Sequence, residues 1–200
     1  MPAHRFVLVP WPARCDDTPL PPLRSGRRVL ASGRRTDWET FFAAAAGADW
    51  QVRAVCTGAD LRKVRRLARG TGAVIQHDIT AAAHQAEVNA ATVYVIAVPD
   101  TGASIGQIRM MNATQGGAPV VASDVVGLRE YVDAYSAVLV PPGDAAALRK
   151  AVYGLLADPR RQQALRRAAR ARGETMAEYL NGIRALVATA VEDVAGGHLP

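Results

Sequence analysis

The first stretch whose residue types suit anion binding is residues 32–37, which read Ser-Gly-Arg-Arg-Thr-Asp. Gly33 lets the backbone come close to a ligand, and the guanidinium groups of Arg34 and Arg35 offer paired N–H donors for phosphate oxygens. A helical pattern follows Thr36, and the N-terminus of a helix adds a positive dipole end. The loop therefore suits a diphosphate group. The alternative is that Gly33 only turns the chain while both arginines point into water.

A second stretch of this kind covers residues 98–107 and leads into a predicted helix that ends near Gln115. Its residues are small, polar and rich in glycine, so free amides at the start of the helix can hold a phosphate or a sugar hydroxyl. It matches neither the dinucleotide-binding GxGxxG pattern nor the Walker A pattern, because no Lys-Ser or Lys-Thr pair follows its glycines. Such loops occur throughout α/β proteins, so this one alone specifies no ligand.

The elements that must position these loops alternate between strand and helix from Arg28 onward. Short apolar runs rich in β-branched residues predict strands at residues 28–32, 51–56, 72–76, 92–98, 119–122 and 137–140. Most of them lack alternating polar residues, as expected of parallel strands buried on both faces. The pattern predicts a doubly wound, Rossmann-like α/β domain with a parallel sheet. Ligands of such sheets bind beyond the carboxyl ends of the strands, where both loops would lie.

Helical patterns fill the gaps between the predicted strands. Thr36 and Glu39 form a capping box at the start of one helix, and Asp144 caps another. We expect the aromatic residues of the first helix, Trp38, Phe41 and Phe42, to lie in the core. On a later helix, His84 and Glu87 are one turn apart and are predicted to form a surface pair. Residues 59–70 carry an apolar stripe opposite a row of cations, and two helices follow at residues 159–172 and 174–193. We interpret the arginines of these helices as solvated faces, with a polyanion-binding patch as the alternative.

Residues 1–27 differ from the rest, with a candidate strand at residues 6–9 and a proline-rich stretch at residues 10–22. We expect them to form an N-terminal arm or connector. Residues 28–158 would then form the α/β domain, and residues 159–200 would form C-terminal helices that pack on it.

Composition excludes several classes of protein. The 200 residues are 50% hydrophobic and 21% charged, which argues against disorder. Charged residues, glycine or proline interrupt every apolar run, so no membrane span or secretion signal is predicted, and we expect a soluble, cytoplasmic protein. Cys15 and Cys56 are too few for a disulfide framework or a metal cluster. The net charge of +6 suits anionic ligands, although the codon use of a GC-rich genome gives the same arginine-rich composition.

Further motifs follow the second loop in a fixed order. After Ser104-x-Gly106-Gln107 come Gly-Ala-Pro-Val-Val-Ala-Ser at residues 117–123 and Glu-Tyr-Val at residues 130–132. Val-Leu-Val-Pro-Pro-Gly-Asp at residues 138–144 and Leu-Leu-Ala-Asp-Pro at residues 155–159 complete the series. Together with the Gly33-Arg34-Arg35 loop, the series resembles the C-terminal, donor-binding domain of the GT-B glycosyltransferases of glycosyltransferase family 4 (group 1).

The resemblance implies that a nucleoside-diphosphate sugar lies across the strand ends. Arg34, with Gly33 and Arg35 beside it, would face the diphosphate, and backbone near His77 and Asp78 would meet the base. The sugar and phosphates would face the second loop, at Ser104, Ile105, Gly106 and Gln107. Asn112 would hydrogen-bond a ribose hydroxyl. Catalysis would stabilise charge on the departing diphosphate, with no cofactor and no obligatory metal, and no catalytic residue is identified.

The sequence departs from the family pattern at three points. The two glutamates that the family carries near the start and middle of the helix after the fourth strand correspond to Ser104 and Asn112. The phosphate-binding lysine falls on Glu39 or Thr40, and Arg35 is its candidate substitute. The acceptor-binding domain that precedes this segment in the family is missing. We therefore expect acceptor contacts from an acceptor-binding domain or protein partner.

Two functions from different classes are compatible with these features. The first is a glycosyltransferase donor-binding domain that takes a sugar nucleotide and transfers the hexose alongside an acceptor domain. The alternative is a catalytically decayed GT-B-like binding or assembly module. A nucleic-acid partner is not expected, because the arginine-rich helices lack interleaved base-stacking aromatic residues, and membrane association would be at most peripheral.

Overall fold

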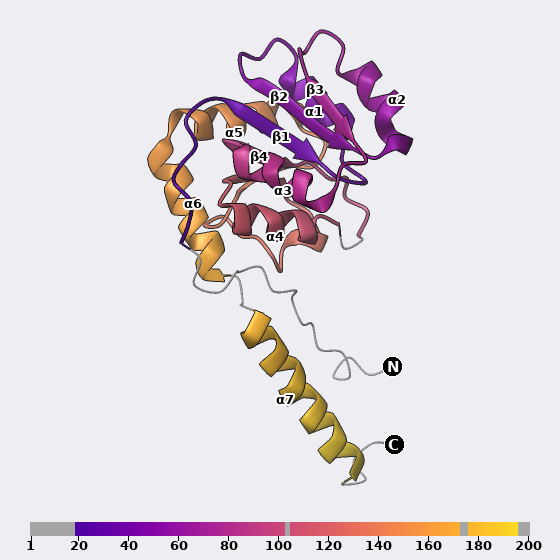
Figure 1. Cartoon of the computed structure of the whole chain (residues 1–200), viewed down its shortest axis with the longest axis vertical. Coiled ribbons are helices and arrows are strands. Elements are labelled where there is room, and N and C mark those ends of the chain that lie inside the picture. The colour runs from indigo at the N-terminus through magenta and orange to yellow at the C-terminus, as the bar shows by residue number, and fades with distance from the viewer. Residues whose placement is uncertain (1–18, 103–104, 173–175, 196–200) are drawn as a thin grey trace.

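The computed structural model describes residues 19–102, 105–172 and 176–195. At its centre is a six-stranded sheet in the order β3-β2-β1-β4-β5-β6, in which all neighbouring strands are parallel (Figure 1). The strands are β1 (Arg28–Ser32), β2 (Gln51–Cys56), β3 (Val74–His77), β4 (Val93–Ile96), β5 (Val120–Ser123) and β6 (Val138–Val140). The strand order reverses direction between β1 and β4, and ligands of doubly wound sheets bind at such a switch point.

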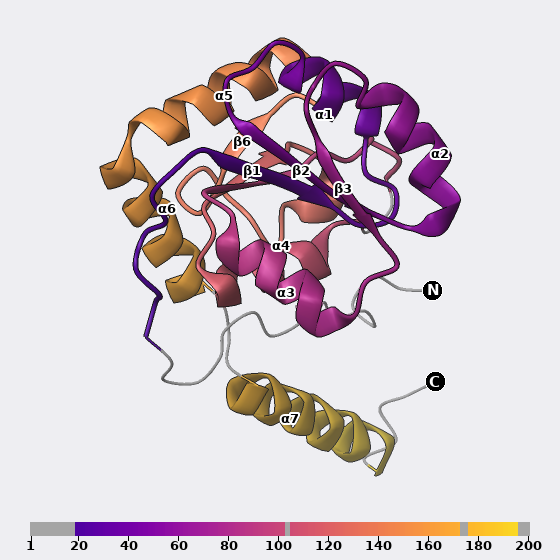
Figure 2. The ribbon, with the colours of Figure 1, turned by 45° about the horizontal axis from the view of Figure 1, so that its top comes forward.

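Helices cover both faces of this sheet, as the doubly wound prediction requires (Figure 2). One face packs on α1 (Trp38–Ala45), α2 (Gly58–Leu67) and α5 (Ala145–Ala157). The other face packs on α3 (Ala81–Ala90), α4 (Gln107–Gly116) and the short 3₁₀ helix η2 (Val126–Leu128). Trp38, Phe41 and Phe42 are buried in the first of these cores, as predicted. No helix in the described part of the chain has the length and hydrophobicity needed to cross a membrane.

The predicted strands agree with the structure to within two residues at each end. β1 and β2 have the predicted bounds, whereas β3 begins at Val74 because Gly72, with a φ of 64°, still belongs to the preceding turn. β4 ends at Ile96, and the next residue leaves the ladder, where the Ala97 carbonyl accepts a hydrogen bond from the Asp37 amide (2.9 Å). The predicted strand at residues 6–9 lies outside the described residues.

The predicted capping box at Thr36 and Glu39 is wrong. Asp37 is the N-cap of α1, and its Oδ1 accepts a hydrogen bond from the Thr40 amide (3.0 Å). The Thr36 hydroxyl instead lies 2.9 Å from the Ser32 carbonyl oxygen and 2.8 Å from that of Gly33. Thr36 therefore closes the loop after β1, and the helix begins one residue later than predicted. The predicted cap at Asp144 is confirmed by its bond from the Ala147 amide (2.8 Å).

His84 and Glu87 are not the surface pair that we predicted. Glu87 is buried between α3 and the sheet, where it accepts hydrogen bonds from Arg28 (2.5 Å), Arg53 (2.7 Å) and Gln76 (2.8 Å). Burial raises the pKa of the Glu87 carboxyl, but the bonds from Arg53 and Arg28 outweigh it and hold the pKa below its usual value. The reason for the error is that sequence spacing along α3 does not show which side of the helix the sheet covers.

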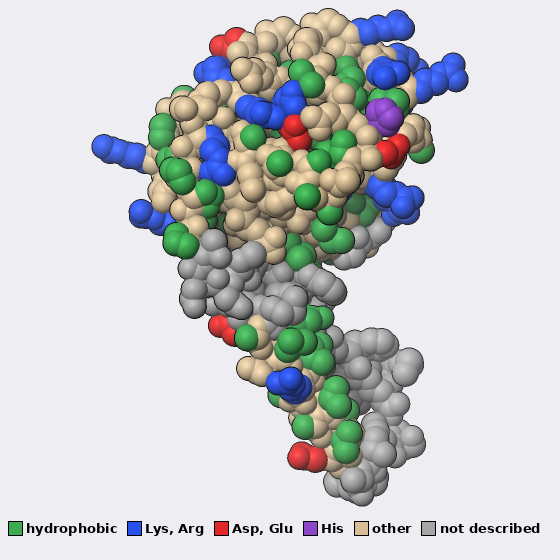
Figure 3. Space-filling view, in the orientation of Figure 1, with side chains coloured by type: hydrophobic (Ala, Val, Ile, Leu, Met, Phe, Trp, Pro, Cys, Tyr) green, Lys and Arg blue, Asp and Glu red, His purple; other side chains and the backbone are tan. Residues whose placement is uncertain are grey.

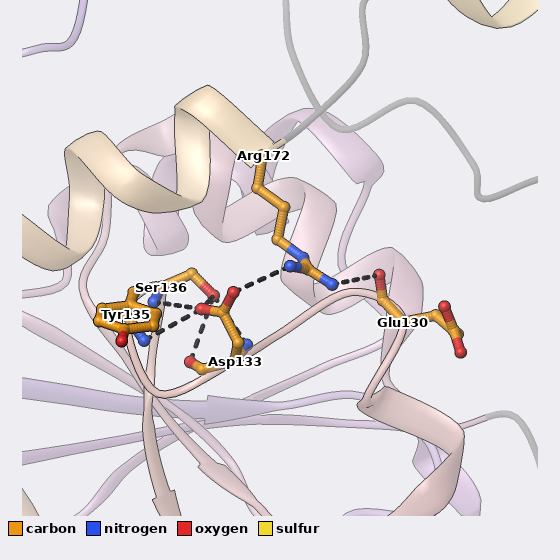
Figure 4. Close-up of polar contacts among 5 residues, drawn as sticks. All are labelled: Glu130, Asp133, Tyr135, Ser136 and Arg172. Atoms are coloured by element: carbon orange, nitrogen blue, oxygen red, sulfur yellow. Dashed lines mark hydrogen bonds and ion pairs between the residues drawn. The ribbon is translucent and has the colours of Figure 1, made fainter.

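The two C-terminal helices differ in how they meet the domain. α6 (Pro159–Arg172) packs against α4 and α5. At its end, Arg172 donates to Asp133 Oδ2 (2.8 Å) and to the Glu130 carbonyl (3.2 Å), which ties the helix to the segment after η2 (Figure 4). Arg166 of α6 is buried and donates to the Pro21 carbonyl, so the interpretation of these arginines as wholly solvated is wrong at this position.

α7 (Met176–Ala195) extends away from the body of the domain (Figure 1). Its exposed apolar side chains include Leu180, Leu186, Val187 and Val191, and green side chains gather along it in Figure 3. We expected both terminal helices to pack on the domain. Among the described residues, neither core cluster takes a side chain from α7, because its apolar stripe does not face the sheet.

Candidate functional site

A pocket of about 650 Å³ lies where β1 and β4 end, beside the point at which the strand order reverses. Three segments line it: the loop after β1, helix α3, and the first six residues of α4 with the two residues before it. The lining residues are Gly33, Arg34, Arg35, His84, Ile105, Gly106, Gln107, Ile108, Arg109 and Asn112. The structure thus brings together all of the predicted site residues except Ser104, His77 and Asp78. Ser104 lies outside the described residues.

The β1–α1 loop is shaped to present backbone amides and two guanidinium groups. Gly33 has a φ of 96° and Arg35 a φ of 56°, so the chain turns sharply twice within three residues. Within the described part of the chain, no hydrogen bond occupies the Arg34 or Arg35 amide, and neither guanidinium has a carboxylate partner. Successive free amides with one residue in the left-handed region form a concavity that binds anions. The loop therefore has the form of an anion site.

Arg109 is a charged pocket residue that the sequence analysis did not identify. It lies on the first turn of α4 with only 7% of its surface exposed. Its Nη1 donates to the Ser32 carbonyl and to Thr36 Oγ1, both at 3.0 Å, and its Nη2 donates to the Arg34 carbonyl at 3.2 Å. Burial lowers the pKa of the guanidinium. The signal in the sequence was an arginine between Ile108 and Met110, within a helix that must pack on the sheet.

The start of α4 is the second anion-binding feature of the pocket. The N-cap residues of α1, α2, α3 and α5 each cap their helix with a side chain, whereas the N-cap residue of α4 is Gly106, which has no side chain. A Cβ atom on Gly106 would lie 3.0 Å from Leu128 Cδ2 and 3.1 Å from Ile96 Cγ2, and the residue has a φ of 100°. Glycine is therefore required here on two counts. The first turn of α4 lines the pocket, so the positive end of the helix dipole lies beside a bound ligand.

His84 closes the pocket on the α3 side through a chain of hydrogen bonds. Its Nε2 lies 2.8 Å from Ser32 Oγ, which in turn lies 2.5 Å from the hydroxyl of the buried Tyr94. Burial, assisted by the nearby Arg109 charge and opposed by Glu87, lowers the pKa of His84. Burial raises the pKa of Tyr94 to about 12, so its hydroxyl stays protonated. The imidazole of His84 is accordingly uncharged near pH 7, and it lines the pocket beside the arginines.

A family model described as "Glycosyl transferases group 1" matches residues 29–158 of the chain. The chain belongs to this family. No match was found among curated proteins.

Solved structures of glycosyltransferases share the fold of this domain. Sucrose-phosphate synthase from Thermosynechococcus elongatus has a TM-score of 0.66 and 22% identity, over 86% of this chain and 46% of its own. HepE from Anabaena, solved in complex with UDP and glucose, has a TM-score of 0.66 and 16% identity, over 82% of this chain and 49% of its own. The chain thus spans about half the length of both proteins.

The C-terminal domain of the group 1 family protein LpcC from Francisella tularensis is a structure of comparable extent. It has a TM-score of 0.57 and 16% identity, and the match covers 74% of this chain and 85% of that one. The predicted GT-B type of Rossmann-like fold is therefore confirmed.

Two predicted site residues of this glycosyltransferase domain lie apart from the pocket. His77 and Asp78 are exposed at the end of β3, and β2 separates that strand from β1. Asp78 Oδ1 accepts a hydrogen bond from the Gly58 amide (2.9 Å), and this bond, with His77 beside it, lowers the pKa of the Asp78 carboxyl. The Asp78 side chain therefore anchors the start of α2. The predicted contact of this backbone with a base stays a prediction.

A larger hollow of about 960 Å³ lies over α2 and is lined by residues of that helix and by Arg69 just beyond its end; its cations are Arg62, Lys63, Arg65, Arg66 and Arg69. None of its lining residues comes from the β1–α1 loop or from α4, the segments that form the pocket at β1 and β4. The described residues contain no group of three His, Cys, Asp or Glu side chains placed to hold a metal ion.

Proposed function

We propose that this glycosyltransferase domain binds a nucleoside-diphosphate sugar and transfers its hexose together with a separate acceptor-binding domain. The observation that carries the proposal is the lining of the pocket at β1 and β4. Three arginines, Arg34, Arg35 and Arg109, line it, and none of its lining residues among those that the structure describes is acidic. A site with this charge favours a ligand with more than one negative charge. Sugar nucleotides meet this requirement, and HepE was solved with UDP-glucose.

Within the proposal, the diphosphate lies between the Arg34 loop and the N-terminal end of α4. During transfer, the bond between the sugar and the diphosphate breaks and the sugar forms a new bond to the acceptor. Negative charge then builds on the departing diphosphate. The guanidinium groups, the Arg34 and Arg35 amides and the helix dipole are fixed before the reaction, so they stabilise this charge without reorganising. In this account no side chain of the domain forms a covalent bond to the sugar, and no metal ion is needed.

Calorimetric titration of the full chain with UDP, GDP and their sugars tests the proposal. We expect saturable binding to at least one of them, weakened about tenfold or more by Arg34→Ala, because a bond to a charged group is lost. Arg62→Ala is the matched control, since it removes the same charge from the exposed face of α2. An absence of saturable binding by every ligand at millimolar concentration would contradict the proposal.

The second candidate function is a binding or assembly module that has lost transfer activity. Asn112 favours it, because this neutral side chain lines the pocket where the family resemblance places a glutamate. If the module has decayed, Arg34→Ala and Arg35→Ala should leave biological activity intact, while surface changes abolish it. If both pocket variants abolish activity, the transferase proposal is favoured.

A further inference from the structure

The charge of Arg109 has no carboxylate partner among the described residues. All three of its hydrogen bonds go to uncharged oxygens: two backbone carbonyls and one hydroxyl. A guanidinium has five N–H groups, so two remain without a bond in the described part of the chain, at Nε and at Nη2. A buried charge is costly unless it is paired. The half-buried Arg28 and Arg53 show the paired arrangement, since both pair with Glu87.

Gly33 keeps one side of this guanidinium open. A Cβ atom added to Gly33 would lie 3.2 Å from Arg109 Cδ and 3.4 Å from Arg109 Nε. Any larger residue would therefore cover the donor that has no bond, on the side where both residues line the pocket. A glycine here thus leaves room for a ligand atom beside Nε.

The position that the family resemblance gives to a phosphate-binding lysine does not supply a cation here. The Glu39 carboxylate is paired with Lys63 on α2 (2.8 Å), and the Thr40 hydroxyl donates to Asp37 Oδ2 (2.6 Å). Neither residue lines the pocket. The cation Arg109 lies on α4, which packs on the other face of the sheet from α1.

We propose that Arg109 is the second phosphate-binding cation of this site, and that the ligand's diphosphate is its missing counter-ion. Three N–H groups hold the loop that carries Arg34, and the two at Nε and Nη2 bind a phosphate oxygen. The inference rests on the proposed function for the identity of the ligand, but the chemistry it requires is only that of a diphosphate.

The alternative role for Arg109 is purely structural, and Arg166 shows what that looks like. Arg166 is also buried and also holds backbone, at the Pro21 carbonyl, but it does not line the pocket. Arg109→Lys and Arg166→Lys therefore form a matched pair. Each keeps its positive charge and loses the planar fork that spans several oxygens.

The experiment follows binding of inorganic pyrophosphate and of UDP to the full chain by calorimetry, with Tm measured for every variant. We expect Arg109→Lys to weaken both ligands about tenfold to hundredfold, as for lost bonds to a charged group. Arg166→Lys should leave both affinities within about twofold while lowering Tm. Equal affinities in the wild type and in a folded Arg109→Lys variant would overturn the inference.

A second measurement uses the wild-type chain, so it does not depend on the folding of a variant. In an isotope-labelled wild-type chain, the Nε–H NMR signal of Arg109 should shift when pyrophosphate is added and stay unchanged when uridine is added. A signal that ignores pyrophosphate while the ligand binds would overturn the inference. If pyrophosphate acts through Arg109 but no sugar nucleotide binds, the inference stands and the proposed function fails. If UDP binds and the Arg109 signal does not shift, the inference fails and the proposed function stands.

Discussion

The Arg109 guanidinium on α4 donates a hydrogen bond to the backbone carbonyl of Arg34 in the β1–α1 loop, at 3.2 Å. The two residues stand 75 positions apart in the chain. The helix after β4 therefore fixes the loop after β1, and the positions of the exposed Arg34 and the buried Arg109 are coupled. Any change that moves one of these two segments should alter how the other meets a ligand.

Gly33→Ala should weaken UDP binding about tenfold or more while Arg109 keeps its charge. The added Cβ would press on Arg109 Cδ and Nε, and a φ of 96° strains any L residue. Calorimetry measures the affinity. Gly47→Ala is the control, because Gly47 also has a positive φ of 66° but has open space around it and lies at the end of α1. Equal losses in both variants would mean that backbone strain alone is responsible.

Gly106→Ala should destabilise the domain by about 2–3 kcal/mol, through the strained φ and through crowding against Leu128 and Ile96. Urea unfolding measures the loss. Gly102→Ala has a similar sign of φ, +65°, but no atom within 4 Å of its new Cβ, so it should cost only the strain, about 1 kcal/mol. If the two variants unfold at the same urea concentration, the close packing under α4 is not as described.

The stability of the folded chain should fall as the pH drops below the ordinary His84 pKa of 6.5. Burial lowers the pKa of folded His84, so the unfolded chain binds the proton more readily in this range. Its contribution is fully present above pH 6.5 and is lost as the pH falls toward the folded pKa. The groups that face His84 are Ser32, Arg109 and Glu87.

Urea unfolding of the wild type and His84→Gln at about pH 7.5 and pH 5.5 checks this expectation. The variant should lose less stability than the wild type between the two pH values, because glutamine does not titrate. A steeper dependence in the variant would show that His84 is more easily protonated in the folded chain than in the unfolded one.

Glu87→Gln should destabilise the domain by about 3 kcal/mol, because it leaves the half-buried Arg28 and Arg53 without their shared counter-ion. Glu39→Gln removes the same charge from an exposed pair with Lys63, and should cost less than about 1 kcal/mol. Chemical denaturation compares the two. A small loss at Glu87 would indicate that water reaches the cluster and replaces the carboxylate.

The sequence by itself determined the strands, most helices and the two loops of the site. Parallel strands buried on both faces require continuous apolar runs, so β1 and β2 could be located to the residue. Glycine and arginine directly after such a run indicated the Gly33 loop. These are local relationships, in which neighbouring residues carry the information.

The tertiary structure alone decided which residues of the helices face the site. Arg109 and His84 were ordinary helix positions in the sequence, and their partner Ser32 is 77 and 52 residues away, respectively. The adjacency of β1 and β4 brings them together, and strand order is set by packing of the whole sheet. The start of α1 was also decided this way, since Arg109 donates to the Thr36 hydroxyl and the Asp37 amide donates to the Ala97 carbonyl. Burial and partner choice depend on distant segments, so local pattern cannot specify them.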